Sequence, residues 1–403
     1  MRSRRDYSVK FKGGLALIFI FYLILLAGCS APPTPKVEEG VSEDDLMKQQ
    51  LLSNEATTQY YRTMLPYKTS PTRGLVYSRY SKMNNRYDID AFELALMRES
   101  QSYFSPDDTY FQEGQNLTKA TVQSLLSRRL TDAELAQEVE IDADFVDIGL
   151  NPTKDERINI DGAEVNPVYL AYLLEQNYVV TKDEGTELEG VTIGLALNPY
   201  QNWQNELGYD QTSILDEATL IEKGKEIASR LLEILRQEEA FKEVPIMFGL
   251  FIVQEESAVT PGHMVAKTLV GKGSSTIKNW ESINEQYYLL PDSTTLSVDA
   301  DLSNQFSSFK DVIKEYYPHY YGVIGIAHAL NNKIENLEIT INIDFYSLAE
   351  KLSFHQLVAQ LIPESFSSEY DIDVVIRSSD EIYGILKRPA NEREVTLKLT
   401  NWK

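Results

Sequence analysis

The chain has 403 residues, of which 43% are hydrophobic and 10% aromatic, enough to bury a sizeable core and to exclude a disordered stalk. Its net charge of −23 argues against a nucleic-acid partner, since phosphate backbones attract basic proteins. The acidic charge serves solubility, and it also repels anionic headgroups and acidic wall polymers unless a local basic patch or divalent cations intervene.

The N-terminus has the layout of a secretory signal. Five basic residues and a single acid occupy positions 1–12, and an apolar stretch follows from Leu15 to Gly28. That stretch is shorter than the roughly 20 apolar residues that a membrane-spanning helix needs. We therefore predict a removable signal peptide over residues 1–28.

The signal ends in Leu26-Ala27-Gly28-Cys29, which resembles the lipobox that bacterial lipoprotein signal peptidase cuts before the cysteine. Small side chains give access to the cleavage site after Gly28, and the Cys29 thiol can form a thioether to diacylglycerol. Each buried methylene adds roughly 0.8 kcal/mol, so two palmitate-like acyl chains anchor durably. We expect attachment to the extracellular face of the cell membrane. The alternatives are an ordinary signal with an incidental cysteine and a single-pass anchor.

Cys29 is the only cysteine, which excludes an internal disulfide and a cysteine-ligated metal, and acylation would remove its thiol as a nucleophile. Without the signal the chain keeps 33 basic and 60 acidic residues, a net charge of −27. Residues 29–45 are rich in proline and acid, which predicts a flexible tether. The 374 residues after Cys29 suffice for two domains.

Hydrophobic periodicity predicts a mixture of helices and strands in the first half. Asp88 is a plausible helix cap, Pro167 suits a first helical turn, and Pro66 ends the first helix. The expected helices cover 46–63, 88–99, 118–130 and 166–176, and the expected strands cover 73–77 and 191–197.

The second half is richer in predicted strands. Its first helix, over 216–239, has the strongest pattern in the chain, with apolar residues at three- and four-residue intervals. The expected strands cover 244–253, 321–329, 337–343, 372–376 and 395–399, and the other helices cover 306–317 and 345–360.

A faint internal duplication is visible. Gly74 is followed after 36 residues by an aromatic segment at Tyr110, and Gly249 is followed after 38 by one at Tyr287. Any two α+β halves can be matched in part, which is the competing explanation. We predict an α+β fold of two related mixed α/β repeats, with antiparallel or mixed sheets, over residues 46–205 and 206–403.

Motifs for chemistry are weak. The four histidines lack the short spacing of a zinc site, and no Gly-x-Ser-x-Gly elbow occurs. Segment 271–275 resembles a phosphate loop only superficially. Acid pairs at Asp371/Asp373 and Asp299/Asp301 could form a glycosidase pair or a calcium site, although such pairs arise by chance among 61 acids. We predict no metal and no cofactor.

The segment Tyr110-Phe111-Gln112-Glu113 places aromatic side chains before polar ones. We consider it a candidate binding lip. A tight turn stabilised by Gly114 explains the segment equally well.

Three segments carry a resemblance to a known family. They are Thr72-Arg73-Gly74-Leu75, the run from Asn85 to Glu93, and Tyr110 to Gln115. Together with the lipobox, they make the chain resemble the CamS family of Gram-positive sex-pheromone precursor lipoproteins. The resemblance implies two repeats, and a signal peptide that is trimmed to a short hydrophobic mating signal. Here that material lies within 17–28; a merely discarded signal is the alternative.

These observations favour a cell-surface, lipid-anchored protein whose body is a non-catalytic binding module. Its partners are expected to be the membrane, through diacylglycerol on Cys29, and a peptide or cell-wall glycan. The alternative is a wall-active or glycan-active hydrolase that uses paired carboxylates, which would need two acids in one cleft. A transporter's substrate-binding component is a further alternative, and it would need two doubly wound parallel domains.

Overall fold

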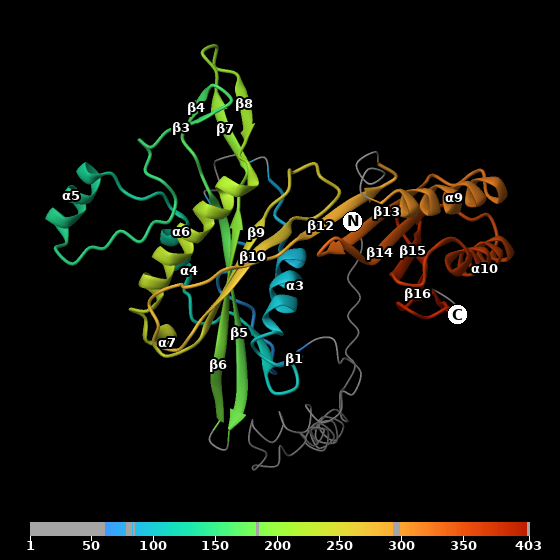
Figure 1. Cartoon of the computed structure of the whole chain (residues 1–403), viewed down its shortest axis with the longest axis horizontal. Helices are drawn as coiled ribbons and strands as arrows, with labels where there is room; N and C mark the ends of the chain where they lie inside the picture. Colours follow the sequence, from blue (N-terminus) through green and yellow to red (C-terminus); the bar gives the residue numbers. More distant parts are fainter. Residues whose placement is uncertain (1–60, 78–82, 84, 183–184, 293–298, 401–403) are drawn as a thin grey trace, which may run out of the picture. The chain divides into compact units, whose positions relative to one another are not determined.

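The computed structural model describes residues 61–77, 83, 85–182, 185–292 and 299–400 (Figure 1). The predicted signal peptide, the lipobox, the tether and nearly all of the helix expected over 46–63 lie outside these residues. Among the helices that are described, none has the length and apolar character needed to cross a bilayer.

The first sheet has seven strands in the order β1-β2-β5-β6-β9-β10-β11. Two neighbouring pairs, β1/β2 and β6/β9, are parallel and the rest are antiparallel, so the sheet is mixed. Its strands are β1 (Arg62–Thr63), β2 (Tyr110–Glu113), β5 (Leu170–Lys182), β6 (Gly185–Leu197), β9 (Ile246–Ile252), β10 (His263–Val270) and β11 (Glu281–Ser282).

Five helices and two hairpins accompany this sheet. The helices are α3 (Ile89–Ser100), α4 (Lys119–Leu126), α5 (Asp132–Ile141), α6 (Glu217–Leu235) and α7 (Glu239–Lys242), and the hairpins pair β3 (Ile158–Ile160) with β4 (Ala163–Val165) and β7 (Tyr200–Gln204) with β8 (Asp210–Ile214). Asp216 caps α6, because its side chain accepts the Thr219 backbone N–H at 2.9 Å.

The second sheet has six strands in the order β12-β13-β14-β15-β16-β17. Only β14/β15 is a parallel pair. The strands are β12 (Glu285–Leu290), β13 (Gly322–Leu330), β14 (Lys333–Asn342), β15 (Asp371–Arg377), β16 (Ile382–Arg388) and β17 (Thr396–Leu399), and the helices are α9 (Ala300–Tyr316) and α10 (Leu348–Ser365).

The two sheets share one topology. Both β2-β5-β6-β9-β10-β11 and β12-β13-β14-β15-β16-β17 pair antiparallel twice, then parallel, then antiparallel twice. The parallel crossover contains α6 and the short α7 in the first sheet and α10 in the second. This confirms two related repeats with mixed sheets. The sheets divide between β11 and β12, not at residue 206, because α6 leads into β9 of the first sheet. We call residues 61–282 repeat 1 and residues 285–400 repeat 2.

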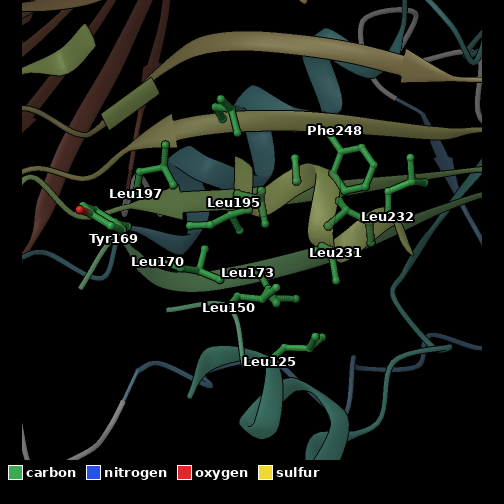
Figure 2. Close-up of a cluster of buried hydrophobic side chains, with 14 of the residues drawn as sticks. Leu125, Leu150, Tyr169, Leu170, Leu173, Leu195, Leu197, Leu231, Leu232 and Phe248 are labelled. Carbon is green, nitrogen blue, oxygen red and sulfur yellow. The ribbon is translucent and has the colours of Figure 1, made fainter. Parts of the chain in front are cut away.

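Repeat 1 buries both faces of its sheet. On one face, α4 and α6 pack against inward side chains such as Leu195 and Phe248, in a cluster shown in Figure 2. On the other face, Phe92 and Leu96 of α3 pack against Phe251 and other strand residues. With helices on both sides, the central strands have no exposed face, and β5 is buried without interruption from Leu170 to Val179.

Glycines let α3 approach the sheet closely. Gly194 of β6 pairs with Gly249 of β9. A Cβ at Gly194 would lie 2.3 Å from a methyl of Leu96 and 2.4 Å from the Phe92 ring, and one at Gly249 would lie 2.6 Å from Leu96. The absence of side chains at these two positions therefore makes room for the α3 side chains.

Repeat 2 buries one sheet face. Side chains such as Leu337, Ile339 and Val374 pack with α9 and α10. The alternate positions point the other way: Ile324 is 41% exposed, Ile385 is 39% exposed, and their neighbours on β14 and β15 are exposed or half-buried. We call this surface the outer face. It includes the cross-strand neighbours Glu338 and Asp373.

A buried carboxylate joins the two repeats. Glu285 of β12 is 1% exposed and accepts the Met264 backbone N–H of β10 at 2.7 Å. Its carboxylate lies 2.9 Å from a guanidinium nitrogen of Arg98 and 2.8 Å from Nε2 of His328. Burial alone would raise the pKa of Glu285, but His328, Arg98 and the Met264 amide together lower it. The carboxylate is therefore ionised inside the protein.

The structure corrects some predicted elements. Residues 71–74 form turns where a strand over 73–77 was expected. In place of the expected helix over 166–176, residues 166–169 are irregular and residues 170–176 lie in β5. A strand that is buried on both faces has a continuous apolar run, which periodicity does not distinguish from a buried helix. The helices expected over 88–99, 216–239, 306–317 and 345–360 are present, with shifted ends, as α3, α6, α9 and α10.

Candidate functional site

The predicted anchor residues Leu26, Ala27, Gly28 and Cys29 lie outside the described residues, so signal cleavage and lipidation stay predictions.

The predicted binding lip forms strand β2, between β1 and β5. Tyr110 is 7% exposed, with the Arg62 guanidinium 4.3 Å from its ring centre. Glu113 accepts hydrogen bonds from the Ser70 backbone N–H at 2.6 Å and the Tyr67 hydroxyl at 2.5 Å. Phe111 and Gln112 pair with Tyr178 and Asn177 of β5. The structure brings these residues together in a sheet, and a role in binding stays a prediction.

The turn after β2 is built on a second buried acid. Glu175, 1% exposed, accepts the backbone N–H groups of residues 115, 116 and 117 at 2.8–3.2 Å. A Cβ at Gly114 would lie 2.4 Å from the Cβ of Glu175. Glycine at this position therefore allows close packing of the turn against β5.

The other motifs that drew attention in the sequence have structural partners. In segment 271–275, the carbonyls of Gly271 and Ser274 accept hydrogen bonds from Arg236. Asp299 caps α9, and Asp371 accepts the Ala390 backbone N–H. Three histidines lie beside carboxylates and His355 is buried. No group of three potential metal ligands occurs in the described part of the chain.

A pocket of about 270 Å³ opens in repeat 1 beside α6. We call it the Tyr169 pocket. Its lining combines apolar, basic and acidic side chains from four separate stretches of sequence: Arg129, Leu150, Pro152, Glu156, Ile158, Tyr169, Lys223, Glu226, Ile227 and Arg230. Sequence reasoning missed this site, because these residues share no motif or spacing.

The pocket carries three cations and two anions. Arg129 donates to Glu156 at 2.6 Å, and Lys223 pairs with Glu226 at 2.8 Å. Arg230 donates to the backbone carbonyls of Asp147 and Gly149, which fixes the loop after α5 against α6. Both carboxylates thus have cationic partners, and the lining keeps one net positive charge in an acidic protein.

Tyr169 contributes a hydroxyl group to the lining of the pocket. The residue is 6% exposed and lies at the margin of the hydrophobic cluster that Leu170, Leu195 and Leu197 help to form (Figure 2). In the described residues its hydroxyl has no hydrogen-bond partner. Burial, followed by the nearby charges of Glu156 and Glu226, raises the pKa of Tyr169, so the hydroxyl stays protonated. It is therefore available as a hydrogen-bond donor.

Comparison with known proteins decides the family. The family model described as "CamS sex pheromone cAM373 precursor" matches residues 67–394. The chain belongs to the CamS family. No curated protein matches it.

Solved structures of other CamS proteins have a similar fold. The sex pheromone precursor from Lactobacillus salivarius subsp. salivarius UCC118 is 26% identical over 87% of this chain and 99% of its own, with a TM-score of 0.75. The C-terminal domain of the sex pheromone staph-cAM373 precursor from Staphylococcus aureus is 25% identical over 79% of this chain and 98% of its own, with a TM-score of 0.65.

The three CamS-like segments of the sequence meet at Arg73. This residue of the first segment forms an ion pair with Glu93 of the second and lies 3.3 Å from Glu113 of the third. Tyr87 of the second segment accepts the Gly74 backbone N–H at 3.0 Å. Burial raises the pKa of Glu93, although Arg73 opposes that shift. The family pattern therefore marks a set of contacts that fixes residues 67–75 to α3 and β2.

Proposed function

We propose that this CamS protein is exported, anchored outside the cell by diacylglycerol on Cys29, and carries a non-catalytic binding module whose ligand site is the Tyr169 pocket. The observation that carries the binding role is the hydroxyl of Tyr169, a residue that is 6% exposed; the hydroxyl has no hydrogen-bond partner among the described residues, and the residue lines a concave and charged site. Pockets that combine apolar walls with a few placed polar groups are the usual form of small-ligand sites.

The composition of the pocket supports binding and not hydrolysis. Hydrolysis by paired carboxylates needs one ionised and one protonated acid on either side of the reacting bond. In the Tyr169 pocket, Glu156 and Glu226 each contact a cation. The cross-strand acids Glu338 and Asp373 lie on the outer face of repeat 2, and Asp373 contacts Lys387 at 3.2 Å.

A site-blocking variant tests the proposed binding site. In Glu226→Trp, a large ring at the pocket rim replaces a side chain that is 65% exposed, which leaves the core unchanged. We expect small molecules found by saturation-transfer NMR on the mature lipoprotein to lose their signals with this variant. Glu233→Trp, at an exposed position of the same helix, is the matched control. If Glu226→Trp keeps every signal, the pocket is not the ligand site.

The anchor is tested separately by Cys29→Ala. The proposal expects the wild-type chain in the membrane fraction with an acyl label, and the variant without the label and released or unprocessed. A variant that stays membrane-bound and labelled contradicts the anchor.

We also propose that the signal peptide can be trimmed to a hydrophobic pheromone-like peptide. Mass spectrometry of culture supernatant should then find fragments that end at Gly28, and the synthetic peptide should act on recipient cells. Absence of both the fragment and the response removes this role.

A further inference from the structure

We infer that the Tyr169 pocket binds the C-terminal carboxylate of a short peptide whose last side chain is small and aliphatic. The inference rests on the proposed function, since it names the ligand class of that same site. It follows from three properties of the lining: which hydrogen-bond donors remain free, how much charge the site carries, and what its walls are made of.

Several hydrogen-bond donors of the pocket lining remain free. Tyr169 offers its hydroxyl, Arg230 uses only Nε and Nη2 on backbone carbonyls, and Lys223 gives one of its three N–H bonds to each oxygen of Glu226. Glu156 accepts from both Arg129 and the Thr153 backbone N–H. An incoming group that satisfies the remaining donors must be an acceptor.

The charge of the site limits what that acceptor can be. The lining has one positive charge in excess, which one carboxylate would neutralise. A phosphate near neutral pH carries about −1.5 to −2 charges, which is more than the lining neutralises. The excess negative charge would be repelled by Glu156 and Glu226. A carboxylate is also planar and matches the fork of an arginine guanidinium.

The walls account for the rest of the ligand. Leu150, Pro152, Ile158 and Ile227 form apolar surface next to the cations. At about 270 Å³ the pocket lies just below the roughly 300–1,000 Å³ range of small-molecule sites, so it suits a small group. An aliphatic side chain beside a carboxylate fits both the size and the mixed lining. Capture of a peptide's C-terminal carboxylate is a known recognition mode, which other proteins achieve with backbone N–H groups.

Calorimetry on the mature lipoprotein in detergent micelles tests the ligand class. The titrants are acetyl-Ala-Val with a free carboxylate, the same peptide as its C-terminal amide, and inorganic phosphate. We expect the free acid to bind at least tenfold more tightly than the amide, and phosphate to compete weakly. Affinity should fall as salt rises, because the donors around the carboxylate are charged.

Two substitutions connect binding to the named donors. Tyr169→Phe keeps the ring in the core and removes only the hydroxyl, so the affinity for the free acid should fall about tenfold. Lys223→Gln should weaken binding several-fold and flatten its salt dependence. Tyr321→Phe, at an exposed tyrosine of repeat 2, should change neither. Denaturant unfolding verifies that Tyr169→Phe is folded.

Each remaining outcome overturns a defined part of the inference. If the free acid and the amide bind equally, the pocket does not recognise the carboxylate. If phosphate binds more tightly than the peptide, the pocket is a phosphate site. No heat from the acid, or an unchanged affinity in Tyr169→Phe, overturns the inference as a whole. The proposed function is judged apart from these results, by whether Glu226→Trp removes the NMR signals of ligands of any class.

Discussion

Repeat 1 and repeat 2 have the same strand order, but they differ in how many faces of the sheet are covered. Repeat 1 places α3 on the face opposite α6, whereas the outer face of repeat 2 is exposed or half-buried over β13 to β16. Parallel crossovers in proteins are almost always right-handed, which would put α6 and α10 on equivalent sides, and α3 would then cover the face that corresponds to the outer face. A shared topology therefore does not fix which surfaces are buried.

The side chains on these two faces differ accordingly: those beneath α3 in repeat 1 are small, and those on the outer face of repeat 2 include charged residues. Repeat 1 has the glycine pair Gly194 and Gly249 beneath α3, and a third small residue, Ser100, bonds to Thr192 at 2.7 Å. Repeat 2 has charged Glu338 and Asp373 as cross-strand neighbours on the outer face. Close helix packing needs small residues, while an acid pair side by side needs water.

The largest predicted effect removes packing at the covered face. Phe92 is fully buried between α3 and the sheet, so Phe92→Ala should lower the free energy of unfolding by about 3–5 kcal/mol. Ile324→Ala on the outer face, where the side chain is 41% exposed, should cost about 1 kcal/mol or less. Urea unfolding of both variants measures the contrast. Similar losses in the two would show that the outer face is buried in solution.

The next effect tests the junction between the repeats. Glu285→Gln removes a buried charge that faces Arg98 and His328, and should cost roughly 3 kcal/mol because His328 loses its carboxylate partner and Arg98 keeps only Glu99, at 3.0 Å. Glu335→Gln, in an exposed pair with Lys333, should stay within about 0.5 kcal/mol of wild type. Differential scanning calorimetry measures both changes. An unchanged melting temperature in Glu285→Gln would mean that the junction contributes nothing to stability.

The same carboxylate predicts a pH dependence. Because the pKa of Glu285 is lowered in the folded protein, its contribution is present above the unfolded-state pKa near 4.5 and is lost as pH falls through the folded value. Wild type should therefore lose more stability than Glu285→Gln between pH 5 and pH 3. Parallel curves in this range would contradict the ion-pair contribution.

Local signals in the sequence predicted much of the fold. The helix over 216–239 was found because the Asp216 cap and the apolar spacing agree, and the match between Tyr110 and Tyr287 pairs β2 with its equivalent, β12. The other half of that match fails, since Gly74 lies in a turn and Gly249 in β9. A strand order is set by long-range pairing, which a single sequence does not display.

The candidate site was much less visible in the sequence. Tyr169 fell within an expected helix, and its pocket partners come from positions 129 to 230, so only the folded chain brings them together. The segment predicted to be a binding lip, Tyr110 to Glu113, has a recognisable sequence pattern because of structural contacts. Gly114 and Glu113 serve contacts with Glu175, Ser70 and Arg73, and those contacts impose a recognisable pattern on the chain.

The smallest predicted effect is a loss of stability in repeat 2 as the pH becomes acidic. His355 of α10 is fully buried in repeat 2, and burial lowers its pKa, assisted by the charge of Lys351 and opposed by a hydrogen bond to the Lys351 carbonyl. Above about pH 6.5 the side chain is neutral in both states, so stability is complete. As pH falls below that value, only the unfolded chain takes up the proton, and stability falls by at most about 1.4 kcal/mol per pH unit.

Hydrogen-exchange mass spectrometry from pH 7 to pH 5 resolves this loss by segment. Protection in α10 and β16 should fall more in wild type than in His355→Leu, which keeps an apolar side chain beside Gly384. Burial raises the pKa values of Glu93 and Glu338, so these groups change stability in the opposite direction as pH falls. Both proteins contain them, and their contributions therefore cancel when wild type and His355→Leu are compared. An equal loss in both proteins, or a loss confined to repeat 1, would show that His355 does not make repeat 2 the acid-sensitive half.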